Sequence, residues 1–427
     1  MQDTVCCGCS VVCDDVSVAL TKTKLHSLGL CQLGHAYCES VLSKKRLLQP
    51  LIRSETGKQM KSTLREALDR SAELLHQWKN PLFLGWSNST NETIQVGLKL
   101  TKQVKGVFDS TASFEYGSLL DHGLYGGEKE KFSLDNIRDS VDHVVYWGVN
   151  PAESHHRHAS RYTVFPKGKN VPEGRESRVV SVLDIRESES MRLANHQLIL
   201  SANGGDSEFL QVLVSEIEGT RERVPKTIAG VPAIEFLSFA KQLREANNVA
   251  IFYGNGLISN THANESLPLI AQVAELLSQN QQRCFSLPMV AYCNTVGAVK
   301  VSYAITKLPF SIDFTSKPPK VFGDVFQGVL QDSFDGIVTV GYDALGFLPG
   351  PIAKAIKQIP IIALSTQPTL TTRAATVVFP TALTGVETGG SVHRMDGTPV
   401  TLLPFRKPKL PVDSELNILT QLLARMK

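Results

Sequence analysis

The chain alternates short apolar runs with longer stretches in which apolar residues recur at helical spacing. Residues 63–78 and 267–279 place apolar side chains at i, i+3, i+4 and i+7, which predicts helices that cover a sheet. The short apolar runs, bounded by turn residues, predict buried strands. They are 81–86, 143–149, 178–185, 248–254, 336–343 and 360–365. This pattern predicts an α/β protein with several mostly parallel sheets.

Several predicted strands end in Gly, Asn or Asp, as in WGVNP (147–151), YGNG (253–256) and VGYD (340–343). In open α/β sheets, ligands bind outside the carboxyl ends of the strands. The same residue types also make tight turns, which is the simpler interpretation of any one of them. The strand ends are therefore candidate ligand-binding edges, but they do not indicate which ligand.

Composition limits the class of protein. The 427 residues, 42% of them hydrophobic, can form two or three folded domains. The 44 Lys and Arg residues against 41 Asp and Glu residues give a net charge of +3 without a basic block, so we expect no nucleic-acid partner. No apolar stretch approaches the roughly 20 residues that span a bilayer, and a secretion signal is missing. We therefore expect a cytoplasmic protein without a membrane partner.

Half of the 8 cysteines lie between residues 6 and 13, in the stretch CCGCSVVC. Three of these and one later cysteine form the pattern C-x2-C-x3-C-x17-C, which consists of Cys6, Cys9, Cys13 and Cys31. Four thiolates are the usual ligands of a 4Fe-4S cluster and of a structural zinc ion, and a reducing cytosol favours metal binding over disulfides. The uneven spacing favours the iron–sulfur cluster over paired zinc knuckles. The alternative is that these are small buried residues.

The other cysteines fall outside this set. Cys7 and Cys38 are left over by the spacing, and we expect Cys38 to be dispensable. Cys284 and Cys293 are expected to lie far from the four candidate ligands.

Signatures of several common enzyme classes are missing from the sequence. It contains no GxxxxGK phosphate loop, no HExxH, no GxSxG elbow, and no GxGxxG after the first predicted strand. Nucleoside triphosphatases, zinc proteases and α/β-hydrolases therefore lose their main support.

Three segments, taken in order, resemble a known family. They are the N-terminal cysteine pattern, GVNPAESHHRHASRYTVFPKG (148–168) and FPTALTGVETGGSVHRMDGTPV (379–400). Together they resemble the B subunit of formylmethanofuran dehydrogenase, in the molybdopterin oxidoreductase superfamily, over nearly the whole chain. The resemblance implies a 4Fe-4S cluster and a tungsten- or molybdenum-bis(pterin) centre that interconverts CO2 and formate. It also implies a zinc amidohydrolase as a partner, which joins the formate to methanofuran.

The resemblance further implies the discontinuous domain plan of that superfamily. A small Cys-rich domain would comprise residues 1–50, and an α/β sheet domain would comprise residues 51–112 plus 298–427. A second α/β domain, residues 113–297, would be inserted into the sheet domain.

The chain departs from the redox members of the family at the metal ligand. In those enzymes the ligand is a cysteine or selenocysteine, followed by a histidine, in a segment that resembles S-V-C-H-G. The corresponding segment here is DSTASFEYGS (109–118), which has Glu115 at the thiolate position and Tyr116 at the histidine position. A hard carboxylate is a poor substitute for a soft thiolate on a tungsten–dithiolene centre.

A second departure removes groups that would bind the anion. A stretch that resembles P-M-R-G-H-aromatic-N in the redox enzymes is LPMVAYCNTVGA (287–298) here. Val290 stands where an arginine would hold formate or CO2, and Tyr292 stands where a second histidine would lie. The combined losses predict that this chain has no catalytic residues for CO2 chemistry and no tungsten or molybdenum bis(pterin).

The non-redox members of the family therefore match the sequence better. The chain resembles the B subunit of the bacterial formyltransferase/hydrolase complex, which works in tetrahydromethanopterin-linked one-carbon metabolism and formaldehyde oxidation. This implies a structural role beside three partners that act on a methanofuran-type carrier: an amidohydrolase-like subunit, a β-helix-like subunit and a formyltransferase subunit. Two alternatives stay open: an active tungsten or molybdenum dehydrogenase subunit with Glu115 as a ligand, and an iron–sulfur electron carrier.

Two further motifs could bind a cofactor or be inherited loops. ESHHRHASR (153–161) gathers imidazole and guanidinium groups that suit a metal or a polyanion, although a hydrogen-bonded loop at an interface is the simpler interpretation. GVETGGSVHRMDG (385–397) has glycines and an arginine that suit the phosphates of a pterin dinucleotide. The candidate residues are Asn150, Glu153, His155, His156, Arg157, His158 and Arg161 in and before the first motif, and Glu387, Arg394 and Asp396 in the second.

Overall fold

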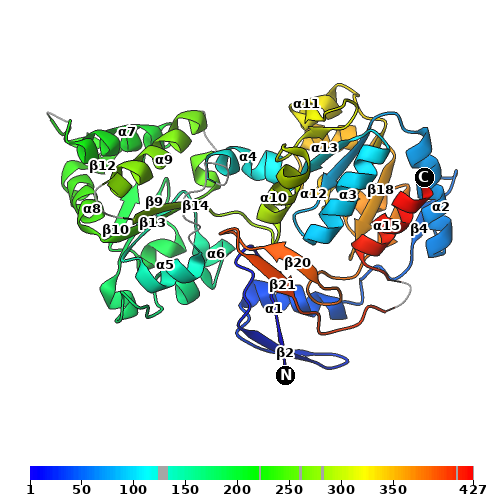
Figure 1. Ribbon diagram of the computed structural model, residues 1–427, viewed down its shortest axis with the longest axis horizontal. Helices are drawn as coiled ribbons and strands as arrows, with labels where there is room; N and C mark the ends of the chain where they lie inside the picture. Colours follow the sequence, from blue (N-terminus) through cyan, green and yellow to red (C-terminus); the bar gives the residue numbers. More distant parts are fainter. Residues whose placement is uncertain (124–132, 221–222, 259–261, 280–282, 410–411, 427) are drawn as a thin grey trace. The chain divides into compact units, whose positions relative to one another are not determined.

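The computed structural model describes residues 1–123, 133–220, 223–258, 262–279, 283–409 and 412–426 (Figure 1). The described chain divides into two compact units. The first unit combines residues 1–114 with residues 292–427, and the second comprises residues 115–291. The three-domain division inferred from the family resemblance stays a prediction.

The first unit is built on a mixed sheet with the strand order β16-β15-β7-β6-β17-β18-β19-β4-β5. Its central strands run parallel, and the strands at both edges pair antiparallel. The parallel strands are β7 (Val107–Ser110), β6 (Pro81–Gly85), β17 (Gly336–Val340), β18 (Ile361–Ser365) and β19 (Val377–Pro380). The edge strands are β16 (Lys320–Val321), β15 (Ile312–Asp313), β4 (Leu51–Arg53) and β5 (Gln59–Lys61).

Helices cover both faces of this sheet. Alternating side chains of one strand enter different cores, so that Phe83 of β6 lies in one hydrophobic cluster while Leu82 and Leu84 lie in the other. Such strands are apolar along their whole length because both faces are buried. One face packs against α2 (Leu64–Gln77), α3 (Asn91–Gln103), α10 (Thr295–Thr306) and α15 (Glu415–Arg425). The other packs against α11 (Val325–Leu330), α12 (Ala344–Phe347), α13 (Gly350–Ile356) and α14 (Leu370–Ala374).

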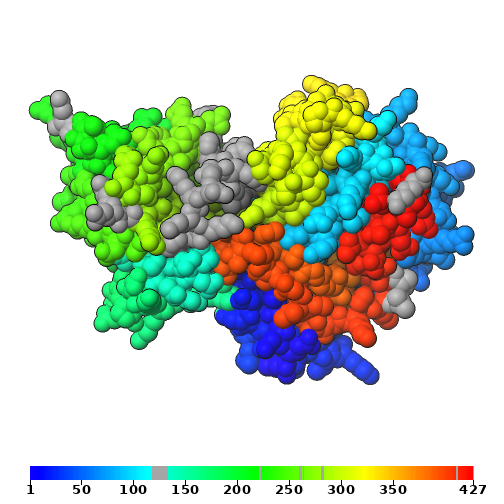
Figure 2. Space-filling model, in the orientation of Figure 1, coloured from blue at the N-terminus to red at the C-terminus, as the bar shows by residue number. Residues whose placement is uncertain are grey.

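The N-terminal segment belongs to the first unit. It forms an antiparallel sheet of β1 (Gln2–Thr4), β2 (Val16–Leu20) and β3 (Leu25–Leu28), followed by α1 (Gln32–Glu39). It packs against the hairpin of β20 (Gly390–His393) and β21 (Pro399–Leu402), where Val5 and Val12 share a core with Val392. Figure 2 shows this contact as the blue residues meeting the orange ones.

The second unit has a parallel sheet with the strand order β10-β9-β8-β13-β14. Its strands are β10 (His196–Ile199), β9 (Val179–Asp184), β8 (His143–Trp147), β13 (Asn248–Tyr253) and β14 (Arg283–Pro288). Its helices include α4 (Thr111–Gly123), which begins in the first unit, α5 (Leu134–Ser140), α6 (Pro151–Ser154), α7 (Gly205–Glu218), α8 (Ala233–Glu245) and α9 (Ala263–Gln279).

The α/β fold class expected from the apolar pattern is confirmed. The predicted strand 81–86 is β6, and the predicted helix 63–78 is α2, which begins after a capping box formed by Thr63 and Glu66. None of the helices in the described chain combines the length and the apolar content that crossing a bilayer requires.

Candidate functional site

The predicted metal-binding cysteines lie in one part of the N-terminal segment. Cys6, Cys9 and Cys13 belong to the loop between β1 and β2, which the bond from the Cys6 N–H to the Cys13 carbonyl closes at 2.8 Å. Cys31 is the N-cap of α1, and its Sγ accepts a hydrogen bond from the Gly34 N–H at 3.4 Å. These hydrogen bonds fix the shape of the loop and of the first turn of α1, the two segments that carry the four cysteines.

The four thiols are close enough to interact electrostatically. Burial raises the pKa of the Cys9 thiol, and the charges of Cys6, Cys13 and Cys31 raise it further. Within the described residues, no three His, Cys, Asp or Glu side chains are arranged around a single ion. A four-iron cluster does not require that arrangement, because each iron takes a different thiolate and the sulfurs stay farther apart. Metal binding by this set stays a prediction.

Backbone groups lie against two of the candidate ligand sulfurs. A Cβ atom on Gly34 would lie 2.7 Å from Cys6 Sγ and 3.8 Å from Cys31 Sγ, so the sulfurs lie directly against the backbone of α1. The Gly8 N–H also donates to Cys6 Sγ at 3.4 Å. Backbone donors stabilise negative sulfur, which is the form that ligates iron. The donor set and its surroundings therefore suit a 4Fe-4S cluster.

The structure corrects the expectation for Cys293. It was expected far from the N-terminal cysteines, but its thiol hydrogen-bonds the Cys7 thiol, and both side chains lie in the core beneath β20 and β21. Its charge also acts on Cys6. The physical reason is the path of the chain, which returns to the first unit at residue 292, just before Cys293. Cys38 lies close enough to Cys6 for their interaction to raise the pKa of the Cys6 thiol.

The positions that differ from the redox family meet in the second unit. Tyr116, which is 6% exposed, accepts a hydrogen bond on its phenolic oxygen from the Ala291 N–H. Burial raises the pKa of Tyr116, and the charge of the neighbouring Glu115 raises it further. The two degenerate segments, 109–118 and 287–298, are therefore neighbours through Tyr116 and the residue after Val290.

Val290 is a buried aliphatic residue at the position of the anion-binding arginine. It is 0% exposed, and its carbonyl accepts a hydrogen bond of 2.9 Å from His155 Nε2. Because a carbonyl can only accept, Nε2 carries the proton, and His155 Nδ1 is left to accept from the Ser154 hydroxyl at 2.8 Å. Burial lowers the pKa of His155 to about 4, so the imidazole is neutral at pH 7. Tyr292, half-buried, lies in the first unit, where its carbonyl accepts from the Thr295 N–H.

The histidines of residues 153–161 point to separate partners. His158 is buried, and its Nδ1 pairs with the Tyr146 hydroxyl at 3.0 Å, which in turn bonds Thr163. Burial lowers the pKa of His158, as it does that of His155, while His156 is half-exposed. In the part of the chain that the structure describes, these imidazoles form no shared metal site.

Two of the remaining candidates of this region line a surface pocket of about 380 Å3. Asn150 and Glu153 line it, beyond the carboxyl ends of β8 and β9, and the Asn150 side-chain carbonyl accepts a hydrogen bond from the Ser190 hydroxyl at 2.5 Å. Arg157 is half-buried, and the Arg161 guanidinium lies 4.8 Å above the ring of Tyr162.

The charged candidates of residues 385–397 are engaged in buried ion pairs. Glu387 receives two hydrogen bonds from Arg46, at 2.9 and 2.7 Å, and another from the Leu383 N–H. Arg394 donates to Asp396 at 2.7 Å, and their side chains are 2% and 0% exposed. The charged side chains of this loop are therefore neutralised by partners within the protein, which favours the inherited-loop interpretation over a phosphate cradle.

No protein-family model matches the chain. Among curated proteins, it is 28% identical over 439 residues to the B subunit of the tungsten-containing formylmethanofuran dehydrogenase 2 of Methanocaldococcus jannaschii, with 100% of this chain and 98% of the relative covered. The protein of the same name from Methanococcus maripaludis is also 28% identical, over 437 residues with the same coverage. The chain resembles the B subunit of formylmethanofuran dehydrogenase along its whole length. The resemblance inferred from the three sequence segments is thereby confirmed.

Solved structures share the fold of this B-subunit-like chain. A chain of the formyltransferase/hydrolase complex (FhcABCD) from Methylorubrum extorquens, solved with methylofuran, matches with a TM-score of 0.68 and 16% identity, over 88% of this chain and 98% of that one. Acetylene hydratase from Pelobacter acetylenicus matches with a TM-score of 0.73 and 13% identity, over 100% of this chain and 69% of that one. At these identities the likeness establishes the fold alone.

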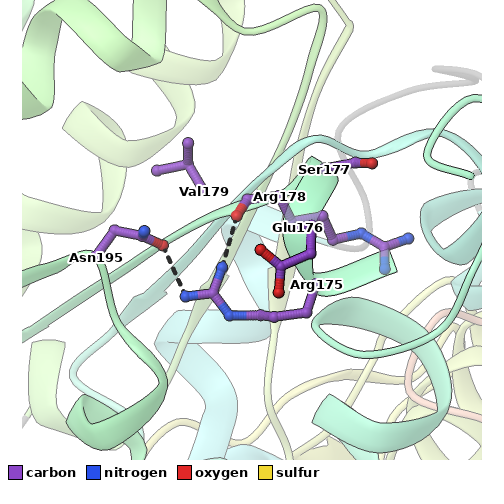
Figure 3. Close-up of a pocket in the computed structure, with 6 residues that line it drawn as sticks. All are labelled: Arg175, Glu176, Ser177, Arg178, Val179 and Asn195. Atoms are coloured by element: carbon purple, nitrogen blue, oxygen red, sulfur yellow. Dashed lines mark hydrogen bonds between the residues drawn. The ribbon is translucent and has the colours of Figure 1, made fainter. Parts of the chain in front are cut away.

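Sequence reasoning missed one polar pocket of the B-subunit-like chain. It has a volume of about 530 Å3 and lies beside residues 175–179 and Asn195 (Figure 3). Arg175 donates to the Arg178 carbonyl at 2.8 Å and to the Asn195 side-chain carbonyl at 3.0 Å. Arg178, 3% exposed, donates to the carbonyls of Val141, Val164, Pro166 and Arg138. The two guanidinium groups hold the segment 164–178 and its neighbours through backbone carbonyls.

Proposed function

We propose that this chain is the B subunit of a formyltransferase/hydrolase complex that removes the formyl group from a methanofuran-type carrier. The complex would serve tetrahydromethanopterin-linked one-carbon metabolism, with formate as a product. Full-length similarity to the B subunit of formylmethanofuran dehydrogenase supports the family, and the shared fold with a chain of the Methylorubrum complex is compatible with the non-redox branch.

One observation carries the loss of redox chemistry in this proposal. At the position of the anion-binding arginine, Val290 is fully buried, and its carbonyl is occupied by His155. A guanidinium placed there would be desolvated without a partner, which is strongly unfavourable. Glu115 offers a hard carboxylate where a tungsten–dithiolene centre needs a soft ligand, so the residues do not fit that group.

The chain's own contribution is then structural. Its thiolates at Cys6, Cys9, Cys13 and Cys31 would hold a 4Fe-4S cluster, which when bound supplies a rigid cross-link and one-electron transfer. The cysteine loop and α1 position those ligands, and the Arg46–Glu387 pair ties the N-terminal segment to the loop after β19. In this proposal residues 1–50 form a Cys-rich domain whose fold depends on that cluster.

The partners proposed for this scaffold are an amidohydrolase-like subunit, a β-helix-like subunit and a formyltransferase subunit. The amidohydrolase-like partner would hydrolyse the formyl carrier, and the formyltransferase partner would transfer the formyl group from tetrahydromethanopterin. Permanent complexes of this kind bury on the order of 2,000 Å2 or more at an interface.

The test is purification of the tagged chain from its native cell under anaerobic conditions. We expect the three partners to co-purify and the complex to release formate from the formylated carrier without any electron acceptor. Elemental analysis should find iron without tungsten or molybdenum. A monomer with no retained partner, or formate release that requires an acceptor, would contradict the proposal.

The second candidate function is that of an active tungsten dehydrogenase, favoured because the curated relatives are named tungsten-containing. It requires tungsten or molybdenum together with pterin in the purified complex. An iron–sulfur electron carrier requires iron alone, a reversible potential and no stable partners. Elemental analysis therefore separates the dehydrogenase from the other two functions, and retention of the three partners separates the proposed scaffold from the electron carrier.

A further inference from the structure

Three segments that are far apart in the sequence meet on one side of the first unit. They are residues 20–24, 42–46 and 405–409. Leu20, Leu42 and Phe405, one from each segment, pack against the same hydrophobic cluster. The Arg406 guanidinium also donates to the Val41 carbonyl at 3.3 Å, directly before the second segment. The fold therefore assembles one surface from three separate parts of the chain.

This surface carries a group of exposed lysines. The three segments contain no Asp or Glu. In the part of the chain that the structure describes, none of the lysines in these segments pairs with a carboxylate. These lysines, which we call the basic surface, are Lys22, Lys24, Lys44, Lys45, Lys407 and Lys409.

The carboxylate that these segments contact is enclosed and is already shared by two cations. Glu387 has a side chain that is 0% exposed, and its oxygens lie 2.7 Å from Arg46 Nη2 and 3.9 Å from Arg406 Nε. Two guanidinium groups and one carboxylate together have a net charge of +1. Glu387 therefore does not offset the charge of the exposed lysines.

The basic surface makes the charge of the whole chain uneven. The chain has a net charge of +3, so the residues outside these six lysines have a net charge of −3. Like charges gathered on one surface raise its electrostatic potential, and a partner of opposite charge is attracted to it. The sequence shows no basic block because the lysines come as pairs from three separate segments.

Apolar side chains beside the lysines favour a protein as the partner. Leu48 and Leu403, which flank two of the segments, are 41% and 47% exposed. Exposed apolar groups with a charged rim are typical of protein interfaces. Proteins that bind single-stranded nucleic acid instead stack bases on exposed aromatic rings, whereas Phe405, the aromatic residue of these segments, packs against the hydrophobic cluster.

We propose that the basic surface docks an acidic face of a partner subunit and speeds the association of that subunit with this chain. This inference rests on the proposed formyltransferase/hydrolase complex and adds to it the side of the B subunit that one partner binds. Carboxylates of the partner would approach lysines that lack an acidic neighbour in the described chain, so no existing ion pair would have to break.

The experiment compares full-length chains with equal changes in charge. One variant combines Lys44→Glu, Lys45→Glu, Lys407→Glu and Lys409→Glu, and a second variant has Gln at the same four positions. The matched control combines four glutamate substitutions at exposed lysines of other segments, which are Lys99, Lys167, Lys169 and Lys226. Urea unfolding checks that each variant is folded. The readouts are the partner subunits retained by the tagged chain and the rate at which the purified partners bind it.

We expect the basic-surface glutamate variant to bind the partners at least about tenfold more slowly than the unmodified chain, because the attraction becomes repulsion. The glutamine variant should fall between these two rates. The control should stay within about twofold of the unmodified chain, although its net charge changes equally. The unmodified rate should also fall as NaCl is raised from about 0.05 to about 0.5 M, because salt screens exposed charges.

Equal partner retention and equal rates in the glutamate variant and the control would overturn the inference and leave the proposed complex standing. If the glutamate variant does not fold, a glutamine variant with the unmodified rate and salt dependence would overturn it as well. An unmodified chain that retains no partner would overturn both proposals. Duplex DNA and phosphatidylserine vesicles serve as further probes. If the glutamate variant loses only its binding to one of these and keeps the unmodified partner rate, the surface serves a different polyanion and the inference is wrong.

Discussion

The phenolic oxygen of Tyr116 accepts a hydrogen bond from the backbone N–H of Ala291. By the resemblance drawn from the sequence, Tyr116 corresponds to a histidine of the redox pattern, and Ala291 follows Val290, which corresponds to its arginine. The segments 109–118 and 287–298 are therefore in contact through a tyrosine and a backbone group. Substitutions at these positions should show whether the segments around Tyr116 and Val290 still take part in catalysis.

Replacing Glu115 by Ala should leave formate release by the assembled complex within about twofold, because a residue that makes no transition-state contact cannot change the barrier. The measurement is the steady-state rate on the formylated carrier, with assembly checked by size-exclusion chromatography. A roughly hundredfold loss in an intact complex, about 2.7 kcal/mol of barrier, would instead identify Glu115 as a metal ligand.

A positive charge introduced at position 290 should lower the stability of the protein and should not create an anion-binding site. Val290→Arg places an unpartnered guanidinium in a position that is 0% exposed. Val290→Met, a long uncharged control, should cost about 1–3 kcal/mol through overpacking, and the arginine should cost about 3 kcal/mol more. Urea unfolding of both variants gives the difference. Equal costs would mean that water or an anion reaches this position.

A methyl group on α1 should disturb the cysteine site. Gly34→Ala would bring its Cβ within 2.7 Å of Cys6 Sγ and 3.1 Å of Leu30, so the sulfur must move. We expect iron per chain after reconstitution to fall to less than half. Gly350→Ala is the control, because a Cβ there meets nothing within 4 Å. Full iron loading of Gly34→Ala would show that Cys6 need not approach the helix.

Breaking the buried Arg46–Glu387 pair should weaken the N-terminal segment. The two side chains are 5% and 0% exposed, so Arg46→Met leaves a buried carboxylate and should cost about 3 kcal/mol. Arg65→Met, at a pair whose arginine is 88% exposed, should change stability by less than about 1 kcal/mol. Limited proteolysis and urea unfolding can be applied to both, and similar losses would show that burial does not strengthen the pair.

The stability of the first unit should fall as pH rises toward 7. Burial raises the pKa of Glu415 to about 7, from an ordinary value of 4.5, although Ser89 donates to its carboxylate at 2.6 Å. Between these values the folded state binds a proton that the unfolded state has lost, so stability is full below pH 4.5 and decreases through pH 7. Asp109, raised to about 7 by burial, acts in the same direction.

Glu415→Gln should remove the contribution of one bound proton to the pH dependence of the free energy of unfolding, which is about 1.4 kcal/mol per pH unit. The check is the urea midpoint between pH 5 and 8 for the variant and the unmodified chain. Glu66→Gln is a control at an exposed capping residue, and it should leave the slope between pH 5 and 8 unchanged. An unaltered slope in Glu415→Gln would place the titrating group elsewhere.

Local pattern was sufficient to predict several core strands and two helices of this fold, and the family resemblance. The strand 81–86 and the helix 63–78 lie where β6 and α2 are, because side-chain period and capping residues act within a few positions of the chain. The three segments that carried the family resemblance were continuous in sequence, so no tertiary information was needed to recognise them.

Tertiary structure alone decided which distant residues meet. Cys293 contacts Cys7 although 286 positions separate them in the numbering, because the chain returns to the first unit at residue 292. The Cys6 sulfur lies against α1 because the bare backbone at Gly34 lets it approach. Sequence by itself determined several core elements, which depend on short-range periodicity and local steric preference, and the family resemblance, which depends on continuous motifs. Contacts across the core depend on how distant segments of the chain pack together, and no short-range sequence pattern specifies that packing.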